Sequence, residues 1–450
     1  MNFTKGILLG SAASLLSFAA AQAADLPSKK SAPVEYVKVC SAYGAGFFFI
    51  PGTDTCLKFG GRIRADYAYV TAKDQFSGVN AANVATVSKA KGAANVLGYE
   101  ARGALNFDAR TATAWGTVQS AASLRMARTT GVLSSDYAAS STSAGATLEW
   151  AYVRFAGFTF GASRDNYAFM PSLTYAGGHW GSFANGAKQI AYTATFGGGV
   201  SATVALQDYL DTASTKSINN LPTGGYYAYN SAPQVNANIR VDQSWGALQL
   251  MGAYADVSVN TATDSYDNNK GVYAIGAGLK VNLPMLAKGD ALYLTANYAN
   301  GMTEYTTGWT SFKSSSYSRE VGGYTMNHPS LVAETTGLET VKSWNIAALV
   351  EHYWTPQYRS NLWATYGQLD APTGAKARAW TGTTGFGDAT VWNVGTNFAW
   401  LPTRRMEIGV ELIYSRVNQD VRSSIVSGNS TVFSKSDSNV TGRLRVERNF

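Results

Sequence analysis

The chain of 450 residues is poor in the side chains that carry most protein chemistry. It has three histidines (His179, His328 and His352) and two cysteines, and charged residues make up only 14% of it. This leaves little material for a metal centre or for a nucleophile paired with a base, so we expect neither metal nor cofactor. The 36 basic residues are spread along the whole length without a basic run, which argues against nucleic acid as a partner.

Long apolar runs are also missing beyond the N-terminal segment. No later stretch reaches the ~18 consecutive apolar residues that a spanning helix requires. Yet 46% of the residues are hydrophobic, and the chain has 45 glycines and 26 tyrosines. Glycine, aromatic and small polar residues in alternation are typical of outer-membrane strands. Composition therefore favours an all-β membrane protein and leaves a large soluble all-β protein as the alternative.

Residues 1–23 predict a secretory signal peptide. Lys5 supplies the positive n-region, Ile7 to Ala20 forms a short apolar region, and Ala21-Gln22-Ala23 fits the small-x-small cleavage rule. A retained membrane anchor is the competing interpretation. We expect cleavage and a mature chain that begins near Ala24, which localises the protein to the bacterial cell envelope.

Residues 24–56 are expected to form an N-terminal periplasmic segment that contains both cysteines, Cys40 and Cys56. In an exported protein such a pair predicts a disulfide, because the envelope is oxidising. Closing a loop of this size is worth ~3 kcal/mol in the chain-entropy model. A pair of metal-binding thiolates is the alternative, and it lacks two further ligands nearby.

Residues 57–450 predict a transmembrane β-barrel. The final stretch Thr441 to Phe450 alternates an apolar face with a charged one, and its free edge requires a partner, which we expect to be the first strand. Short turns alternate with long loops, as in a barrel with short periplasmic turns and long external loops. The sixteen expected strands are Leu57 to Val70, Val96 to Asp108, Thr113 to Met126, Thr147 to Phe155, Phe158 to Asp165, Gln189 to Phe196, Val200 to Asp208, Val235 to Gln243, Ala247 to Val257, Val272 to Leu283, Ala291 to Ala299, Ser343 to Trp354, Arg359 to Asp370, Thr390 to Trp400, Met406 to Val417 and Thr441 to Phe450.

Aromatic residues gather beside the short turns. The turns themselves are expected at Ala156-Gly157, Gly197 to Gly199, Ser244 to Gly246, Pro284 to Asp290, Thr355 to Gln357 and Leu401 to Thr403. Rings collected at one end of the strands predict a girdle at a membrane interface. Within the strands, charged residues alternate with apolar ones, and a lipid-facing Arg or Lys at mid-membrane costs ~2 to 4 kcal/mol. The charged face is therefore expected to line a wet interior.

The region around the cysteines resembles a known family, the general porins of alphaproteobacterial outer membranes. The resemblance rests on Val34 to Cys40, Ala42 to Phe47, Ile50 to Thr53, Thr55 to Leu57, Gly60 to Arg64 and the terminal Arg448-Asn449-Phe450. It implies a homotrimer of 16-stranded water-filled barrels in outer-membrane lipid, passing small hydrophilic solutes and ions. We expect the barrel-assembly machinery to recognise the terminal strand, in which Arg448 occupies a position that is usually aromatic.

Membership also implies that the third long loop folds inward and narrows the channel. Here that loop is Asn166 to Lys188, which we expect to pack on the wall through aromatic and imidazole side chains: Phe169, Tyr175, His179 and Trp180. An ordinary external loop is the alternative. The loop contains no Asp or Glu, unlike the acidic constriction that general porins share.

Strands around the closure are expected to carry a basic wall that faces this loop. It consists of six inward arginines: Arg62, Arg64, Arg102, Arg125, Arg443 and Arg445. Inward carboxylates on the same or nearby strands would pair with much of this charge. Since charge lining a narrow pore sets the barrier for ions, we expect a weak anion preference or none.

The leading functional hypothesis is passive diffusion of small hydrophilic solutes, without catalysis. A barrel enzyme is a second class, and it would need a Ser or Asp beside a histidine such as His352. A solute-specific channel is a third class, and it would carry an aromatic slide or a saturable site in the pore.

Overall fold

The computed structural model describes residues 38–70, 97–133, 146–176, 186–208, 218–219, 232–258, 269–306, 331–334, 337–376, 387–419, 425–426, 429–430 and 436–450. The chain forms two compact units, residues 1–56 and 57–450. The expected signal peptide, residues 1–23, lies outside the described residues. In the described part, no helix is long and apolar enough to span a membrane.

The first unit is held by a disulfide between Cys40 and Cys56, whose Cα atoms lie 6.0 Å apart. The short helix η1 (Ser41–Tyr43) and the strand β1 (Phe47–Phe49) lie between the two cysteines. Phe47 and both cysteines are buried in one small apolar cluster. The structure confirms the predicted disulfide.

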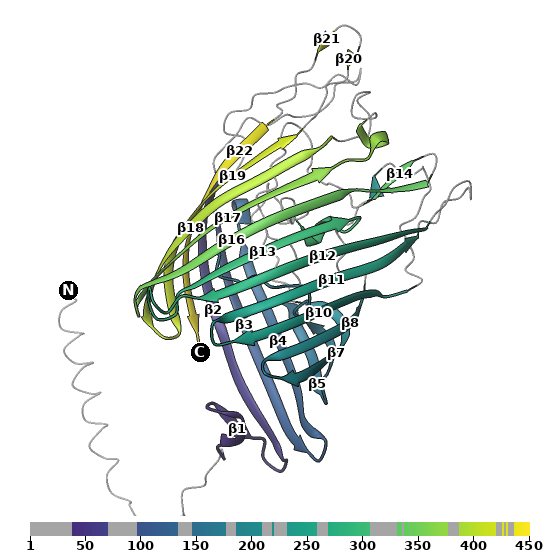
Figure 1. The fold of residues 1–450 in the computed structure, drawn as a ribbon. Coiled ribbons are helices and arrows are strands. Elements are labelled where there is room, and N and C mark those ends of the chain that lie inside the picture. The colour runs from purple at the N-terminus through teal and green to yellow at the C-terminus, as the bar shows by residue number, and fades with distance from the viewer. Residues whose placement is uncertain are drawn as a thin grey trace, which may run out of the picture. The chain divides into compact units, whose positions relative to one another are not determined.

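The second unit is a closed antiparallel barrel in which neighbours in sequence are neighbours in the wall (Figure 1). The last strand pairs with the first from Arg62↔Asn449 to Val70↔Thr441. The backbone N–H of Phe450 donates to the carbonyl of Gly61 over 3.0 Å, and the Gly61 N–H donates back. The sixteen wall strands are β2 (Thr55–Val70), β3 (Leu97–Thr113), β4 (Gly116–Thr129), β5 (Ala146–Phe155), β6 (Phe158–Ser163), β7 (Ala187–Gly197), β8 (Val200–Gln207), β10 (Gln234–Gln243), β11 (Gly246–Ser258), β12 (Asn269–Asn282), β13 (Ala291–Asn300), β16 (Lys342–Thr355), β17 (Tyr358–Asp370), β18 (Ala389–Thr403), β19 (Met406–Gln419) and β22 (Ser436–Asn449).

The predicted fold is confirmed, and two turns are corrected. We expected the first turn between Asp108 and Thr113, and another at Leu401 to Thr403. Instead β3 continues to Thr113 and β18 to Thr403, and the turns follow at residues 114–115 and 404–405. In each case the threonine hydroxyl accepts a hydrogen bond from the backbone N–H two residues later, 3.2 Å from Trp115 and 3.4 Å from Arg405. A threonine that closes a turn in this way moves the turn to its C-terminal side.

Short elements occur in the long connections, where none was predicted. The helices η2 (Gly131–Leu133) and η3 (Thr303–Tyr305) follow β4 and β13. A small sheet joins β9 (Ile218–Asn219), β14 (Leu331–Glu334) and β15 (Gly337–Thr340), and β20 (Ile425–Val426) pairs with β21 (Asn429–Ser430). Strands of two to four residues carry too few alternating positions to be recognised from a sequence.

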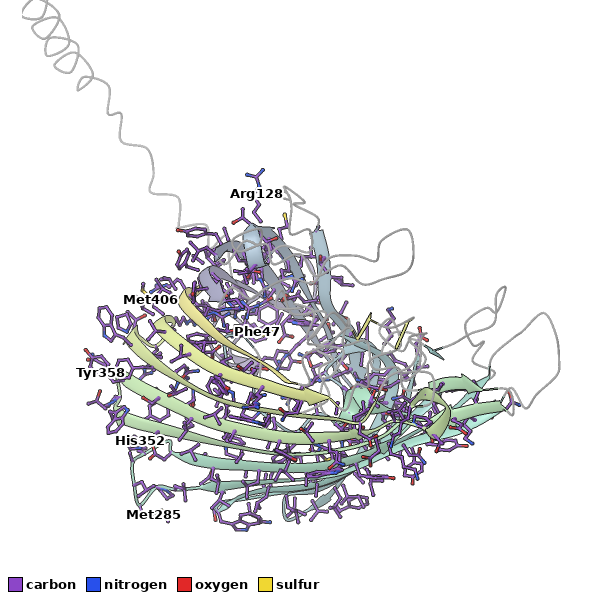
Figure 2. All side chains as sticks on the ribbon, turned by 90° about the horizontal axis from the view of Figure 1, so that it is seen from above. Phe47, Arg128, Met285, His352, Tyr358 and Met406 are labelled. Atoms are coloured by element: carbon purple, nitrogen blue, oxygen red, sulfur yellow. A yellow bond between two sulfur atoms is a disulfide. The ribbon has the colours of Figure 1, made fainter. Side chains whose placement is uncertain are left out.

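The two faces of the wall follow the predicted alternation. Ile63, Ile346 and Leu412 are 57%, 52% and 55% exposed, whereas the neighbouring Asn345 and Glu411 are buried. An apolar face turned outward and a polar face turned inward are what a barrel in lipid requires. Figure 2 shows Met285, His352, Tyr358 and Met406 along one end of the strands. The short turns and their flanking rings gather at this end, as the girdle prediction requires.

Candidate functional site

The third long loop leaves the wall after Ser163, the last residue of β6. Asp165 fixes its start. One carboxylate oxygen of this buried residue accepts hydrogen bonds from the Gln207 side chain (3.0 Å), the Asn236 side chain (2.9 Å) and the Tyr167 backbone N–H (2.9 Å). Strands β8 and β10 therefore hold the point at which the chain turns into the lumen.

From there the stretch from Arg164 to Ala176 follows the inner wall. The Asn238 side chain on β10 donates to the Asn166 carbonyl over 2.6 Å. The Asn397 side chain on β18 donates to the Leu173 carbonyl over 2.9 Å. These contacts lie six strands apart in the sixteen-stranded wall. The inward course expected of the loop is confirmed over these residues.

Apolar packing supports the middle of the loop. Met170 lies in a buried cluster with residues of β16, β17 and β19, including Leu349 and Trp363, and Phe169 packs at its edge. Gly278 on β12 makes room for Phe169, because a Cβ atom there would collide with the phenyl ring. The glycine therefore serves close packing of the loop on the wall.

The last residues of this stretch, Tyr175 and Ala176, are held by charged side chains of β19 and β22. We call this group of residues the latch: Tyr175, Ala176, Glu411, Arg443 and Arg445. The backbone N–H groups of Tyr175 and Ala176 donate to the two carboxylate oxygens of Glu411 over 2.6 and 2.7 Å. Arg443 and Arg445 donate to the Tyr175 carbonyl over 2.6 and 3.1 Å. The backbone N–H groups thus face a carboxylate, and the Tyr175 carbonyl faces two guanidinium groups.

The Tyr175 ring is also enclosed. The Arg445 guanidinium lies 4.6 Å from the ring centroid, and the phenol hydroxyl donates to Glu407. Burial, together with the charge of Glu407, raises the pKa of the phenol well above its ordinary value. Tyr175 is therefore neutral and acts as a hydrogen-bond donor.

Of the four loop residues singled out from the sequence, Phe169 and Tyr175 lie against the inner wall as described. His179 and Trp180 lie outside the described residues. The sequence reasoning did not identify Glu411 as the group that holds the loop. Alternation in the last strands predicts that Glu411 points inward. No sequence pattern predicts that it accepts hydrogen bonds from backbone N–H groups of a distant loop.

The six arginines of the expected basic wall all face the lumen, and each has a carboxylate partner. Arg64 pairs with Glu447 (2.6 Å) and Arg102 with Glu100 (2.8 Å). Glu149 lies between two arginines, 3.6 Å from Arg62 and 3.4 Å from Arg125. Asp66 also pairs with two arginines, Arg443 at 3.3 Å and Arg445 at 2.6 Å.

Glu149 owes its position to a local irregularity of β5. Ser123 pairs with Trp150 and Leu124 with Leu148, so Glu149 is an extra residue in the ladder. Such a bulge re-aims a side chain, and here the carboxylate reaches arginines of β2 and β4. Sequence alternation alone does not reveal this bulge.

His352 lies at the turn end of β16. Its Nδ1 atom is 2.6 Å from the Asp290 carboxylate, and its ring contacts Trp354 edge-on at 4.5 Å between centroids. Within the described residues no hydroxyl group is hydrogen-bonded to this imidazole. The contacts are those of a residue that anchors the turn before β13 within the aromatic girdle.

Comparison with known proteins agrees with this architecture. The family described as the Porin subfamily matches residues 25–443. Porin Omp2b of Brucella suis is 30% identical over 70% of this chain and 92% of its own. Porin Omp2a of Brucella ovis is 34% identical over 58% of this chain and 72% of its own.

A solved structure shares the fold. The outer membrane channel DcaP of Acinetobacter baumannii superposes with a TM-score of 0.60 at 16% identity, over 89% of this chain and 99% of its own. A closed barrel, an apolar outer face, a charged lumen and a loop folded into it are together the architecture of a diffusion channel. The chain belongs to the Porin subfamily, and it is an outer-membrane channel for passive diffusion.

Proposed function

We propose that this channel passes small hydrophilic solutes and ions with a weak preference for anions, and that the loop from Asn166 to Lys188 narrows it. The observation that carries the proposal is the charge of the wall formed by β22 and β2 to β5. Among the described side chains, its eight inward arginines face five carboxylates: Arg62, Arg64, Arg102, Arg110, Arg125, Arg154, Arg443 and Arg445 against Asp66, Glu100, Asp108, Glu149 and Glu447.

The preference is weak because most of this charge is paired. An ion pair presents a dipole to a passing ion, whose field decays faster than that of a single charge, and salt screens the remainder within about 10 Å at 0.1 M. On the adjacent strand β19, Glu411 is buried under the loop, and Glu407 pairs with Arg359 over 3.0 Å. These carboxylates therefore contribute little negative charge to the aqueous path.

The test is the reversal potential of the purified channel in a gradient of KCl across a planar bilayer. We expect a small potential of the sign that marks chloride as the more permeant ion. A potential close to the cation limit would contradict the proposal.

We further propose a homotrimer, cleavage after Ala23, and transport without catalysis. Family membership supports the trimer, and the short apolar region ahead of Ala21-Gln22-Ala23 supports cleavage. N-terminal sequencing of the membrane-extracted protein should begin near Ala24, and a chain that begins at Met1 would contradict cleavage. Hydrolysis of an ester substrate that is lost in His352→Ala would contradict transport without catalysis.

A further inference from the structure

The inner face of β5 carries a column of three side chains with no part in holding the loop: Trp150, Tyr152 and Arg154. Cross-strand pairs place all three toward the lumen, since Tyr152 pairs with Ala121, which in turn pairs with the inward Asp108. The Arg154 guanidinium lies 4.4 Å from the Tyr152 ring centroid. The Trp150 and Tyr152 centroids are 5.7 Å apart with an angle of 34° between the planes. The three groups thus form one continuous surface.

This surface is open to the pore, unlike the rings of the loop. Tyr167 and Tyr175 are 1% and 7% exposed because they pack between the loop and the wall. Trp150 and Tyr152 are half-buried, and Arg154 is exposed. Rings that stay partly accessible in a water-filled lumen are not needed to fill a core, so the column requires another explanation.

Arg154 also differs from the other lumenal arginines. Of the arginines that the described strands turn inward, it is the one without a carboxylate within ion-pair distance. The nearest acidic group across the ladder, Asp108, is held by two hydrogen bonds from Arg110 and one from Gln119. The guanidinium of Arg154 is therefore available to an anion from solution.

The column lies on the path of a solute that has passed the loop. Ala151 pairs with Ala162, one residue before β6 ends and the loop begins. Trp150 is therefore at the level where the loop starts, and Tyr152 and Arg154 follow toward the turn at Ala156-Gly157. A solute moving toward this turn therefore meets the Trp150 ring, then the Tyr152 ring and then the Arg154 guanidinium.

We propose that Trp150, Tyr152 and Arg154 form a saturable binding site for small carboxylates carried on a flat ring, with the ring on the aromatic surface and the carboxylate on Arg154. Adjacent aromatic rings favour a flat solute, and a guanidinium favours a carboxylate through paired N–H donors. A channel site must release its solute quickly, so half-saturation is expected on the order of 1 mM. The proposal rests on the proposed function, since it requires an open lumen.

The experiment measures current through single channels in KCl while benzoate is added. Acetate, which lacks the ring, and benzamide, which lacks the charge, are the comparison solutes. Tyr152→Leu and Arg154→Gln test the two parts of the site. Tyr192→Leu is the matched control, because Tyr192 is exposed on the outer face. Folding of each variant is checked by its migration as an unboiled barrel.

We expect benzoate to reduce the current of the wild-type channel saturably, with acetate and benzamide acting only at about tenfold higher concentration or more. Each site variant should raise the half-saturating benzoate concentration by about tenfold, and Tyr192→Leu should leave it unchanged. Equal, non-saturating effects of benzoate and acetate, or unchanged saturation in both variants, would overturn the proposal. Absence of any current in KCl alone would instead contradict the proposed function.

Discussion

Replacing Glu411 by alanine should release the third long loop from the wall at Tyr175 and Ala176. The carboxylate accepts two backbone hydrogen bonds, from Tyr175 and Ala176, and 4% of the residue is exposed. A hydrogen bond to a charged group contributes about 1.5 to 3 kcal/mol, so loss of both weakens the latch by at least ~3 kcal/mol. That free energy corresponds to roughly a 100-fold larger fraction of released loop. Arg443 and Arg445 still hold the Tyr175 carbonyl, so release is partial.

The assay is single-channel conductance combined with swelling of liposomes in sugars of increasing size. Glu411→Ala should show higher mean conductance, more frequent current fluctuations and entry of larger sugars. Glu447→Ala is the matched control, since it also removes a lumenal carboxylate, yet Glu447 pairs with Arg64 and not with the loop. If the two variants behave alike, the effect arises from lumenal charge, and the reasoning about the latch is refuted.

Three further predictions follow from packing, lipid exposure and the disulfide. Gly278→Ala should displace Phe169 and increase current noise, because overpacking costs about 1 to 3 kcal/mol, whereas Gly442→Ala, which has open space around it, should behave as wild type. Ile346→Arg on the lipid face should lower the free energy of unfolding in lipid vesicles by about 2 to 4 kcal/mol, measured by urea titration. An unchanged urea midpoint would contradict the claim that Ile346 faces lipid. Cys40→Ser should leave barrel conductance unchanged but make the N-terminal unit protease-sensitive, since the disulfide stabilises it by about 3 kcal/mol.

The barrel was predictable because its physics is local and periodic. Alternation along a strand decides which residues face lipid, and turn residues between strands decide where each one ends. Arg62 and Asn449, for example, could be placed on neighbouring strands because a closed sheet leaves no free edge. The two misplaced turns show that alternation does not fix the last residue of a strand. That residue depends on a local hydrogen bond, here from the backbone N–H of Trp115 to the Thr113 hydroxyl and from that of Arg405 to the Thr403 hydroxyl.

The site was less predictable, because its contacts join residues far apart in the chain. Alternation placed Arg443 and Arg445 in the lumen but could not reveal that both hold the Tyr175 carbonyl. Glu149 faces two arginines only because a bulge shifts it, and no pattern around Trp150 distinguishes its open ring from the packed ring of Trp363. Contacts between residues far apart in the chain depend on how the strands and the loop pack together, and the local alternation of residue types does not show this.

Single-channel conductance of the purified, unboiled protein in planar bilayers tests the central claim most directly. The proposed trimer of water-filled channels predicts current steps that close in threes and scale linearly with salt concentration. A correctly folded barrel that gives no steps in KCl would contradict the account, because it would mean that the lumen is plugged or opens only for a particular substrate.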